Sequence, residues 1–131
     1  GEIDCRTNDG FILPSTKTGM QLEQIVQQTV VGYVVWFLEA NLCNNHRYKF
    51  FNVPAAIGSV EISPIFNKDV ARIICLYNAA LKETLARHSL DLTDVYEPTK
   101  GGSGFSNNFY HCYCIHLDNR ILGLIQDQIS K

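Results

Sequence analysis

The fold of this chain is decided by the stretch Tyr48-Lys49-Phe50-Phe51-Asn52-Val53-Pro54. Aromatic and β-branched residues favour a strand, and Pro54, which has no N–H to give to a ladder, ends it. A second run of this kind, Leu90-Asp91-Leu92-Thr93-Asp94-Val95-Tyr96, has alternating apolar residues and is closed by Glu97-Pro98. The two runs are separated by a helical segment, so we expect them to be parallel strands of one sheet.

Helical periodicity surrounds these strands. Residues 19–41 carry apolar side chains mostly three and four apart, which predicts an amphipathic helix. Val31, Val35 and Trp36 widen its apolar face, so we expect this helix to be well covered. The next helix is predicted to begin at Asn67, a good N-cap residue, with its buried stripe formed by Val70, Ile73, Ile74, Tyr77, Leu81 and Leu85.

The last helix is predicted to follow His116, with one apolar face formed by Leu117, Ile121, Leu124, Ile125 and Ile129. The first six residues read as the end of a further strand, so the chain opens inside the pattern and we expect a segment upstream. Strand and helix alternate throughout, which indicates a single α/β domain over residues 1–131 with a parallel sheet and right-handed crossovers. Long loops at 7–18, 55–66 and 99–116 follow strand ends, where such sheets bind ligands.

The composition argues against two classes of function, nucleic-acid binding and membrane association. The chain of 131 residues is 46% hydrophobic and 18% charged, which is ordinary for a globular domain, and its formal charge of −2 argues against nucleic acid. Its most apolar run, residues 30–38, is about half of the roughly 20 residues that span a bilayer, so no membrane association is expected. The odd number of cysteines favours reduced thiols and a cytoplasmic location: Cys5, Cys43, Cys75, Cys112 and Cys114.

The loop before the last helix gathers the residues with most chemistry, Asn107-Asn108-Phe109-Tyr110-His111-Cys112-Tyr113-Cys114-Ile115-His116-Leu117. His116 lies just before a helix at a strand-end loop and is the leading candidate for a general base. The spacing Cys112-x-Cys114 is too short for the usual zinc site, so neither a metal nor a cofactor is expected. Two alternatives stay open: a cysteine nucleophile activated by His116, or buried inert cysteines. His46, His88 and His111 are read as structural or solvated.

Four short blocks, in this order, resemble the C-terminal half of an SGNH (GDSL-type) hydrolase. They are Gly1-Glu2-Ile3-Asp4-Cys5-Arg6, the strand end Asn52-Val53-Pro54, the run Tyr77-Asn78-Ala79-Ala80-Leu81 with Asp94-Val95-Tyr96 after it, and Ile115-His116-Leu117. Proteins of this family are esterases and acyl hydrolases with a flavodoxin-like, three-layer α/β fold. The resemblance therefore implies that fold, truncated at its N-terminus, and serine ester hydrolysis.

The first block corresponds to the family's Gly-x-Asn-Asp motif, whose asparagine helps to hold the oxyanion. Gly1 and Asp4 match, whereas Ile3 stands in place of the asparagine. Arg6 is a candidate substitute, because a fixed cation on this loop stabilises developing negative charge. The oxyanion and substrate loop is thus expected to comprise Gly1, Glu2, Asp4 and Arg6. An equally weighted alternative is that Glu2, Asp4 and Arg6 form a structural salt-bridge cluster.

The last block corresponds to the family's Asp-x-x-His motif, in which the aspartate orients the catalytic histidine. Tyr113-Cys114-Ile115-His116 supplies the histidine but not the aspartate. Tyr113 is a candidate orienting hydroxyl, and Asp118 a candidate orienting acid. The family's Gly-Asp-Ser nucleophile block is expected upstream of Gly1. The loop serines here are of types that suit turns and N-caps: Ser15, Ser59, Ser63, Ser103 and Ser106.

Two functions follow as expectations. The first is an ester hydrolase acting on a small polar molecule or a glycan, completed by an upstream serine. The second is a degenerate α/β module that binds a ligand or partner without catalysis, motivated by Ile3 and Tyr113. The glycine run Gly101-Gly102-Ser103-Gly104 lacks the lysine of a P-loop and is expected to be a flexible loop or lid. A truncated sheet would expose an apolar edge, so self-association is also expected.

Overall fold

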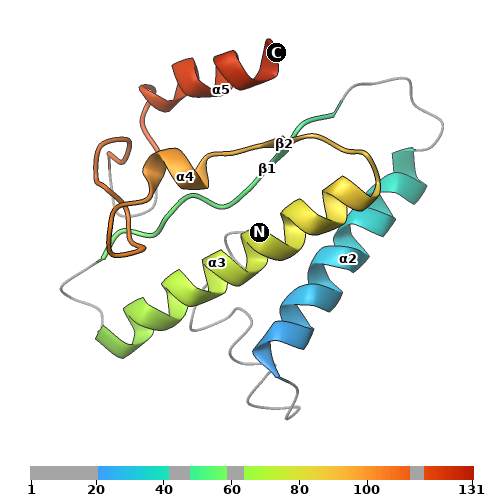
Figure 1. Ribbon diagram of the computed structural model, residues 1–131, viewed down its shortest axis with the longest axis horizontal. Coiled ribbons are helices and arrows are strands. Elements are labelled where there is room, and N and C mark those ends of the chain that lie inside the picture. The colour runs from blue at the N-terminus through green and yellow to red at the C-terminus, as the bar shows by residue number, and fades with distance from the viewer. Residues whose placement is uncertain (1–20, 42–47, 59–63, 113–116) are drawn as a thin grey trace.

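A computed structural model describes residues 21–41, 48–58, 64–112 and 117–131. Its elements in chain order are α2 (Leu22–Asn41), β1 (Phe50–Phe51), α3 (Pro64–Arg87), β2 (Leu92–Thr93), α4 (Tyr96–Thr99) and α5 (Ile121–Ile129). Figure 1 shows α2 and α3 side by side on one side of the two strands, with α5 on the other side. The described part of the chain is therefore rich in helix around a small parallel sheet.

The core lies between α2, α3 and the strands. The stripe predicted for α3 is confirmed: of its six positions five are buried, and Val70 packs partly buried against them. From α2 the buried side chains are Ile25, Val26, Val30 and Val34. The expected helix start at Asn67 is wrong, because α3 begins at Pro64. Proline is favoured at a first helical position, where its missing N–H has no intrahelical partner.

The outer side of α2 departs from the sequence prediction. Val35 is exposed and Trp36 retains 62% of its accessible surface, so the expectation that these residues are covered is wrong. Apolar residues occur on more than one face of α2. Among the described helices, α2 packs against α3. A single neighbouring helix covers one stripe of side chains, which leaves the opposite side of α2 to solvent.

The sheet is parallel, as predicted, with Phe50 opposite Leu92 and Phe51 opposite Thr93. Side chains alternate across it, so Phe50 is buried beneath the helices while Phe51 is 47% exposed. Both strands are shorter than the expected runs 48–53 and 90–96. After Thr93 the strand ladder ends, because the N–H groups of Val95 and Tyr96 donate to side chains instead of to the neighbouring strand. Helix α4 begins there.

Helix α5 begins at Ile121, later than predicted. Asp118 Oδ1 accepts a hydrogen bond from the Arg120 N–H, which makes a turn of residues 118–120 before the helix. Ile121 is the buried residue of the expected face, whereas Ile129 is exposed. Gln128 attaches α5 to the end of β2, since its side chain accepts from Asp94 N–H at 2.7 Å and donates to Asp94 O at 2.8 Å.

The glycine run is a tight hairpin instead of an unconstrained loop. Lys100 and Ser106 form an antiparallel bridge, and the Gly101 N–H donates to Phe105 O at 2.6 Å. A Cβ on Gly101 would lie 3.2 Å from Phe105 O, and Gly104 has a φ of +85°. Both positions therefore favour glycine for steric reasons, and the hairpin holds Ser106 in a fixed place.

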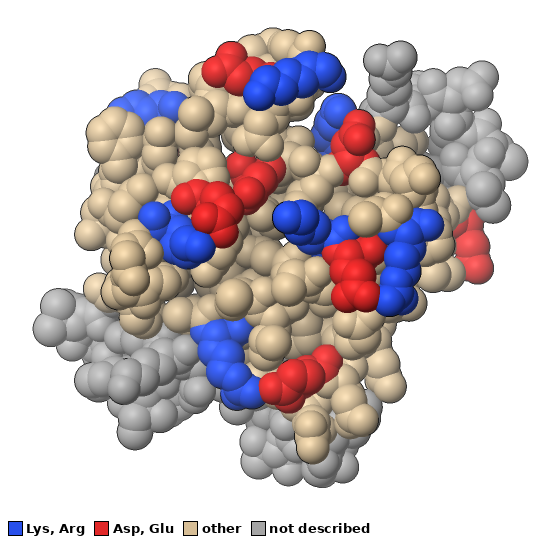
Figure 2. Space-filling model, viewed as in Figure 1, with Lys and Arg blue, Asp and Glu red and all other residues tan. Residues whose placement is uncertain are grey.

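Figure 2 shows acidic and basic side chains interspersed over one face, mostly as neighbouring pairs. The ion pairs of the described residues include Lys49 with Asp91 and Lys100 with Glu97, each at 2.9 Å. In this view neither sign of charge forms a patch of its own. Within the described ranges, none of the helices combines the length and the apolar character that crossing a membrane requires.

Candidate functional site

Two groups of polar side chains lie beyond the carboxyl ends of the strands. We call the first the strand-end network, and it comprises Asn52, Asn78, Asp94 and Thr99. We call the second the loop cluster, and it comprises Ser106, His111, Asp118 and Arg120. The two groups differ in what their polar atoms bind.

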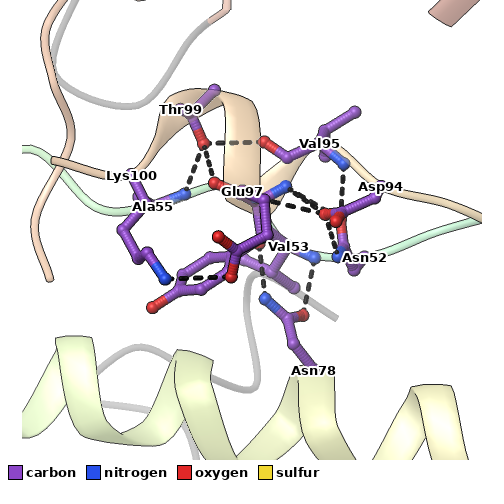
Figure 3. Close-up of polar contacts among 10 residues, drawn as sticks. Asn52, Val53, Ala55, Asn78, Asp94, Val95, Glu97, Thr99 and Lys100 are labelled. Carbon is purple, nitrogen blue, oxygen red and sulfur yellow. Dashed lines mark hydrogen bonds and ion pairs between the residues drawn. The ribbon is translucent and has the colours of Figure 1, made fainter.

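Asn52 is the centre of the strand-end network (Figure 3). Its Oδ1 accepts hydrogen bonds from the N–H of Val95 at 2.7 Å and of Tyr96 at 3.1 Å. Its Nδ2 donates to Asp94 Oδ1 at 2.7 Å, and that oxygen also accepts from the N–H groups of Tyr96 and Glu97. Asn52 and Asp94 thus satisfy the first N–H groups of α4, which have no partner within the helix.

The rest of the network ties β1 to its surroundings. Asn78 on α3 accepts from Val53 N–H at 2.8 Å and donates to Val53 O at 2.7 Å. Thr99 Oγ1 accepts from Ala55 N–H at 3.0 Å and donates back to Val95 O at 2.7 Å. Among the described residues, no buried side-chain nitrogen or oxygen lacks a partner. The network therefore holds the strand ends, and its buried side-chain polar atoms are all paired.

The loop cluster is built on the glycine hairpin. Ser106 is fixed by its own N–H, which donates to Ala56 O at 2.7 Å beyond the end of β1. Its Oγ lies 2.7 Å from His111 Nδ1 and accepts the Asn108 N–H at 2.9 Å. Asn108 has a φ of +63°, which asparagine tolerates better than most residues and which turns the chain back toward Ser106. A hydroxyl and an imidazole nitrogen thus face each other at hydrogen-bond distance.

Asp118 and Arg120 complete the loop cluster. The Asp118 N–H donates to Tyr110 O at 2.7 Å, and Arg120 Nε donates to Asp118 Oδ2 at 2.7 Å, with a second bond from the Arg120 guanidinium to the same oxygen. These hydrogen bonds lower the pKa of Asp118, which keeps its carboxylate charged. Partial burial lowers the pKa of His111, while the Asp118 carboxylate acts in the opposite direction. His111 is therefore mostly neutral at neutral pH.

Only some of the candidate site residues predicted from the sequence lie in the described parts of the chain. Asp118, the candidate orienting acid, is paired with Arg120. Cys112 is exposed, and Cys75 is a free, exposed thiol. Over the described ranges, no group of three or more His, Cys, Asp or Glu side chains is arranged to hold a metal ion. The other candidates lie outside the described residues: His116, Tyr113, Cys114, Gly1, Glu2, Asp4 and Arg6.

Sequence reasoning missed the contact between Ser106 and His111, since it read one as a turn residue and the other as solvated. The signal that was present is the segment Ser106-Asn107-Asn108-Phe109-Tyr110-His111. Two asparagines follow the serine, and asparagine favours turns that reverse the chain. A reversal of this length returns the histidine to the serine, but nothing in the sequence states which side chains then meet.

Comparison with known proteins supports the fold. No protein-family model and no curated protein sequence matches the chain. Among solved structures, it is similar to a GDSL-like lipase from Bacteroides thetaiotaomicron, with 15% identity and a TM-score of 0.61. It is also similar to a candidate acylhydrolase from Bacteroides fragilis, with 21% identity and a TM-score of 0.60. Each likeness covers 79% of this chain and 50% of the other, so the chain spans half the length of these proteins. The resemblance to GDSL-type hydrolases is thus supported at the level of the fold.

Proposed function

We propose that this chain forms the C-terminal half of an SGNH-type serine ester hydrolase whose complete domain is a flavodoxin-like, three-layer α/β fold. The observation that carries the proposal is the likeness in fold to two proteins named as a lipase and an acylhydrolase over 79% of the chain. The order of the sequence blocks supports it independently. So does the parallel pairing of β1 with β2, because parallel strands place the loops that follow them at one edge.

In the proposed reaction a serine upstream of Gly1 attacks the carbonyl carbon of the ester. His116 takes the proton of that serine and later returns one to the leaving alcohol. The loop formed by Gly1, Glu2, Asp4 and Arg6 stabilises the oxyanion, with Arg6 supplying the positive charge. The proposal is that Tyr113 or Asp118 orients His116.

Asp118 is suited to an orienting role by its charge. Arg120 lowers the pKa of its carboxyl group, so the group is ionised wherever an imidazolium would form. Its two oxygens already accept bonds from Arg120, but a carboxylate oxygen has a second lone pair. A histidine could therefore be bound without breaking the ion pair.

The proposed substrate is an ester of a small polar molecule or of a glycan. The experiment uses the complete reading frame that contains this chain, assayed on p-nitrophenyl acetate and on acetylated oligosaccharides. We expect turnover that falls by about 10³-fold or more in His116→Ala, because the nucleophile loses its base. His88→Ala is the matched control, since His88 is exposed at the end of α3 and should leave turnover unchanged.

An inactive complete protein would overturn the hydrolase proposal and favour the alternative, a non-catalytic ligand- or partner-binding module. That alternative rests on Ile3 and Tyr113, which stand where the family has polar catalytic residues. Titration with the same acetylated oligosaccharides by calorimetry would then measure binding without turnover.

We also propose that the isolated chain self-associates through the sheet. Phe51 is 47% exposed on β1, and within the described residues β1 pairs with β2 alone. Exposed aromatic strand residues favour association between chains. Light scattering should show oligomers that Phe51→Lys disperses, whereas Leu122→Lys, at an exposed leucine of α5, should not. A monomeric wild-type chain at high concentration would contradict this proposal.

A further inference from the structure

We propose that Ser106 is a nucleophile toward small activated acyl esters and that His111 is its general base. The inference is independent of the hydrolase proposal, because it uses neither His116 nor an upstream serine. It rests on the loop cluster alone, whose residues all lie in the described part of the chain.

The first observation is the geometry of the pair. Ser106 Oγ and His111 Nδ1 are 2.7 Å apart, which is the distance that a nucleophilic hydroxyl and its base require. Oγ already accepts the Asn108 N–H at 2.9 Å. In the tautomer of neutral His111 that carries its proton on Nε2, Nδ1 accepts a hydrogen bond from the Ser106 hydroxyl.

The second observation is how firmly each partner is held. The Ser106 N–H is bound to Ala56 O, and Lys100 pairs with Ser106 across the hairpin. On the other side, His111 forms an antiparallel bridge with Leu117. Because the backbone on both sides is held by hydrogen bonds, the hydroxyl and the imidazole are already positioned for proton transfer.

The third observation is the charge around the pair. The base is mostly neutral at neutral pH, because partial burial lowers the pKa of His111. Asp118 interacts electrostatically with His111 and would stabilise the imidazolium that forms on proton transfer. The Asn108 N–H would in turn stabilise negative charge as it develops on Ser106 Oγ.

The reaction needs only the ester and, for release of the acyl group, water. Ser106 Oγ attacks the acyl carbon of an aryl ester, its proton passes to His111 Nδ1, and a new Oγ–C bond forms. The bond between the acyl carbon and the aryl oxygen breaks, and the aryl oxide leaves with the electron pair. His111 then releases the serine proton to solvent. Water can later cleave the acyl-serine, which gives the carboxylic acid and restores the Ser106 hydroxyl. Half-burial of Ser106 and His111 leaves them accessible to a small acyl group.

A purely structural role of the same pair predicts a different result. If His111 only braces the loop, then glutamine, whose Oε1 can accept the same hydrogen bond, should preserve everything that histidine does. If His111 is a base, glutamine should preserve the fold and abolish the reactivity. His111→Gln therefore separates the two roles.

The test is acylation of the 131-residue chain by p-nitrophenyl acetate at pH 7.5, followed by release of p-nitrophenolate and by peptide mapping in the mass spectrometer. We expect one acetyl group on Ser106, absent in Ser106→Ala, and about 10²-fold slower acylation in His111→Gln. Ser103→Ala is the matched control, since Ser103 lies in the same hairpin at an exposed position, and His88→Gln is the control for loss of a histidine. Both should acylate at the wild-type rate.

Circular dichroism and urea unfolding establish that each variant is folded before its rate is compared. Acetyl groups found only on lysines or on the N-terminus would overturn the inference, as would equal acylation of Ser106 in His111→Gln. These outcomes do not bear on the hydrolase proposal, which is judged by turnover of the complete protein and by His116→Ala.

Discussion

The strand-end network and the loop cluster both use short polar side chains, yet their hydrogen bonds run to different partners. Asn52, Asn78 and Thr99 bind backbone N–H and C=O groups, and each is buried. In the loop cluster Ser106 meets His111, and Asp118 meets Arg120, so side chains bind side chains. The first arrangement fixes the course of the backbone, whereas the second brings a hydroxyl, a base and a charge together.

Burial and the type of hydrogen-bond partner distinguish polar residues that stabilise the fold from polar residues that are available for chemistry. A buried amide that binds backbone groups is needed for stability, since its loss leaves those groups unpaired. A partly exposed pair of side chains contributes less to stability and is available for chemistry. Variants in the strand-end network should therefore lower the free energy of unfolding, whereas variants in the loop cluster should mainly lower the rate of acylation.

The largest effect on stability is expected for Asn52→Ala. Loss of the amide leaves the Val95 N–H without its acceptor and removes a donor to Asp94, whereas the Tyr96 N–H keeps Asp94 Oδ1. The free energy of unfolding should fall by about 1 to 3 kcal/mol, the cost of one buried unpaired group. Urea unfolding measures it, with the exposed Asn119→Ala as control. A change below about 0.5 kcal/mol would remove the distinction between the two clusters.

A smaller loss is expected for Thr99→Val, which keeps the shape of the side chain and removes the hydroxyl. The Ala55 N–H then loses its acceptor and Val95 O loses a donor, both in buried surroundings. Unfolding should become easier by about 1 to 2 kcal/mol, again by urea titration. Thr29→Val, on the exposed side of α2, is the matched control and should lie near zero.

A pH effect on stability is expected from His111. Its pKa in the folded chain lies below the ordinary value of about 6.5, so the folded state binds fewer protons than the unfolded state as the pH falls through that value. The stabilising contribution is present above pH 6.5 and declines below it. His111→Gln should therefore lose less stability than the wild type between pH 7.5 and 5.5. An equal loss in both chains would show that His111 has no depressed pKa.

The smallest effect on stability is expected from Arg120→Gln, because the Arg120 side chain is exposed and water screens its attraction to the partly buried Asp118. The pKa of Asp118 should rise toward its ordinary value, since the Arg120 hydrogen bond is the main cause of its depression. Any stability that the pair adds is present above about pH 3.9 and is lost as the pH falls through the folded-state pKa. Carboxyl titration by NMR measures the shift, and an unchanged pKa would contradict the assignment. The control is Arg87→Gln, at the pair with Glu83 on α3.

Periodicity in the sequence was enough to predict α2, α3 and α5 apart from the exact starts of α3 and α5, the parallel strands, and the buried stripe of α3, whereas α4 was not predicted. Apolar residues spaced three and four apart on a helix share one face, and this does not depend on what the helix packs against. The residues at which the strands end could not be predicted from periodicity. Leu90 to Tyr96 reads as a strand by its alternation, but the Asn52 and Asp94 side chains take the N–H groups at its end and start α4 there.

Only the tertiary structure decided which polar groups meet. Asn52 and Asp94 are 42 residues apart in the chain and Asn52 and Tyr96 are 44 apart, so no local pattern pairs them. Among the described helices α2 packs against α3, and Trp36 remains exposed, which hydrophobicity alone does not predict. The sequence by itself determined the kinds of side chain near the strand ends. Which of them hold the backbone and which face one another depends on distances that arise when separated segments pack together.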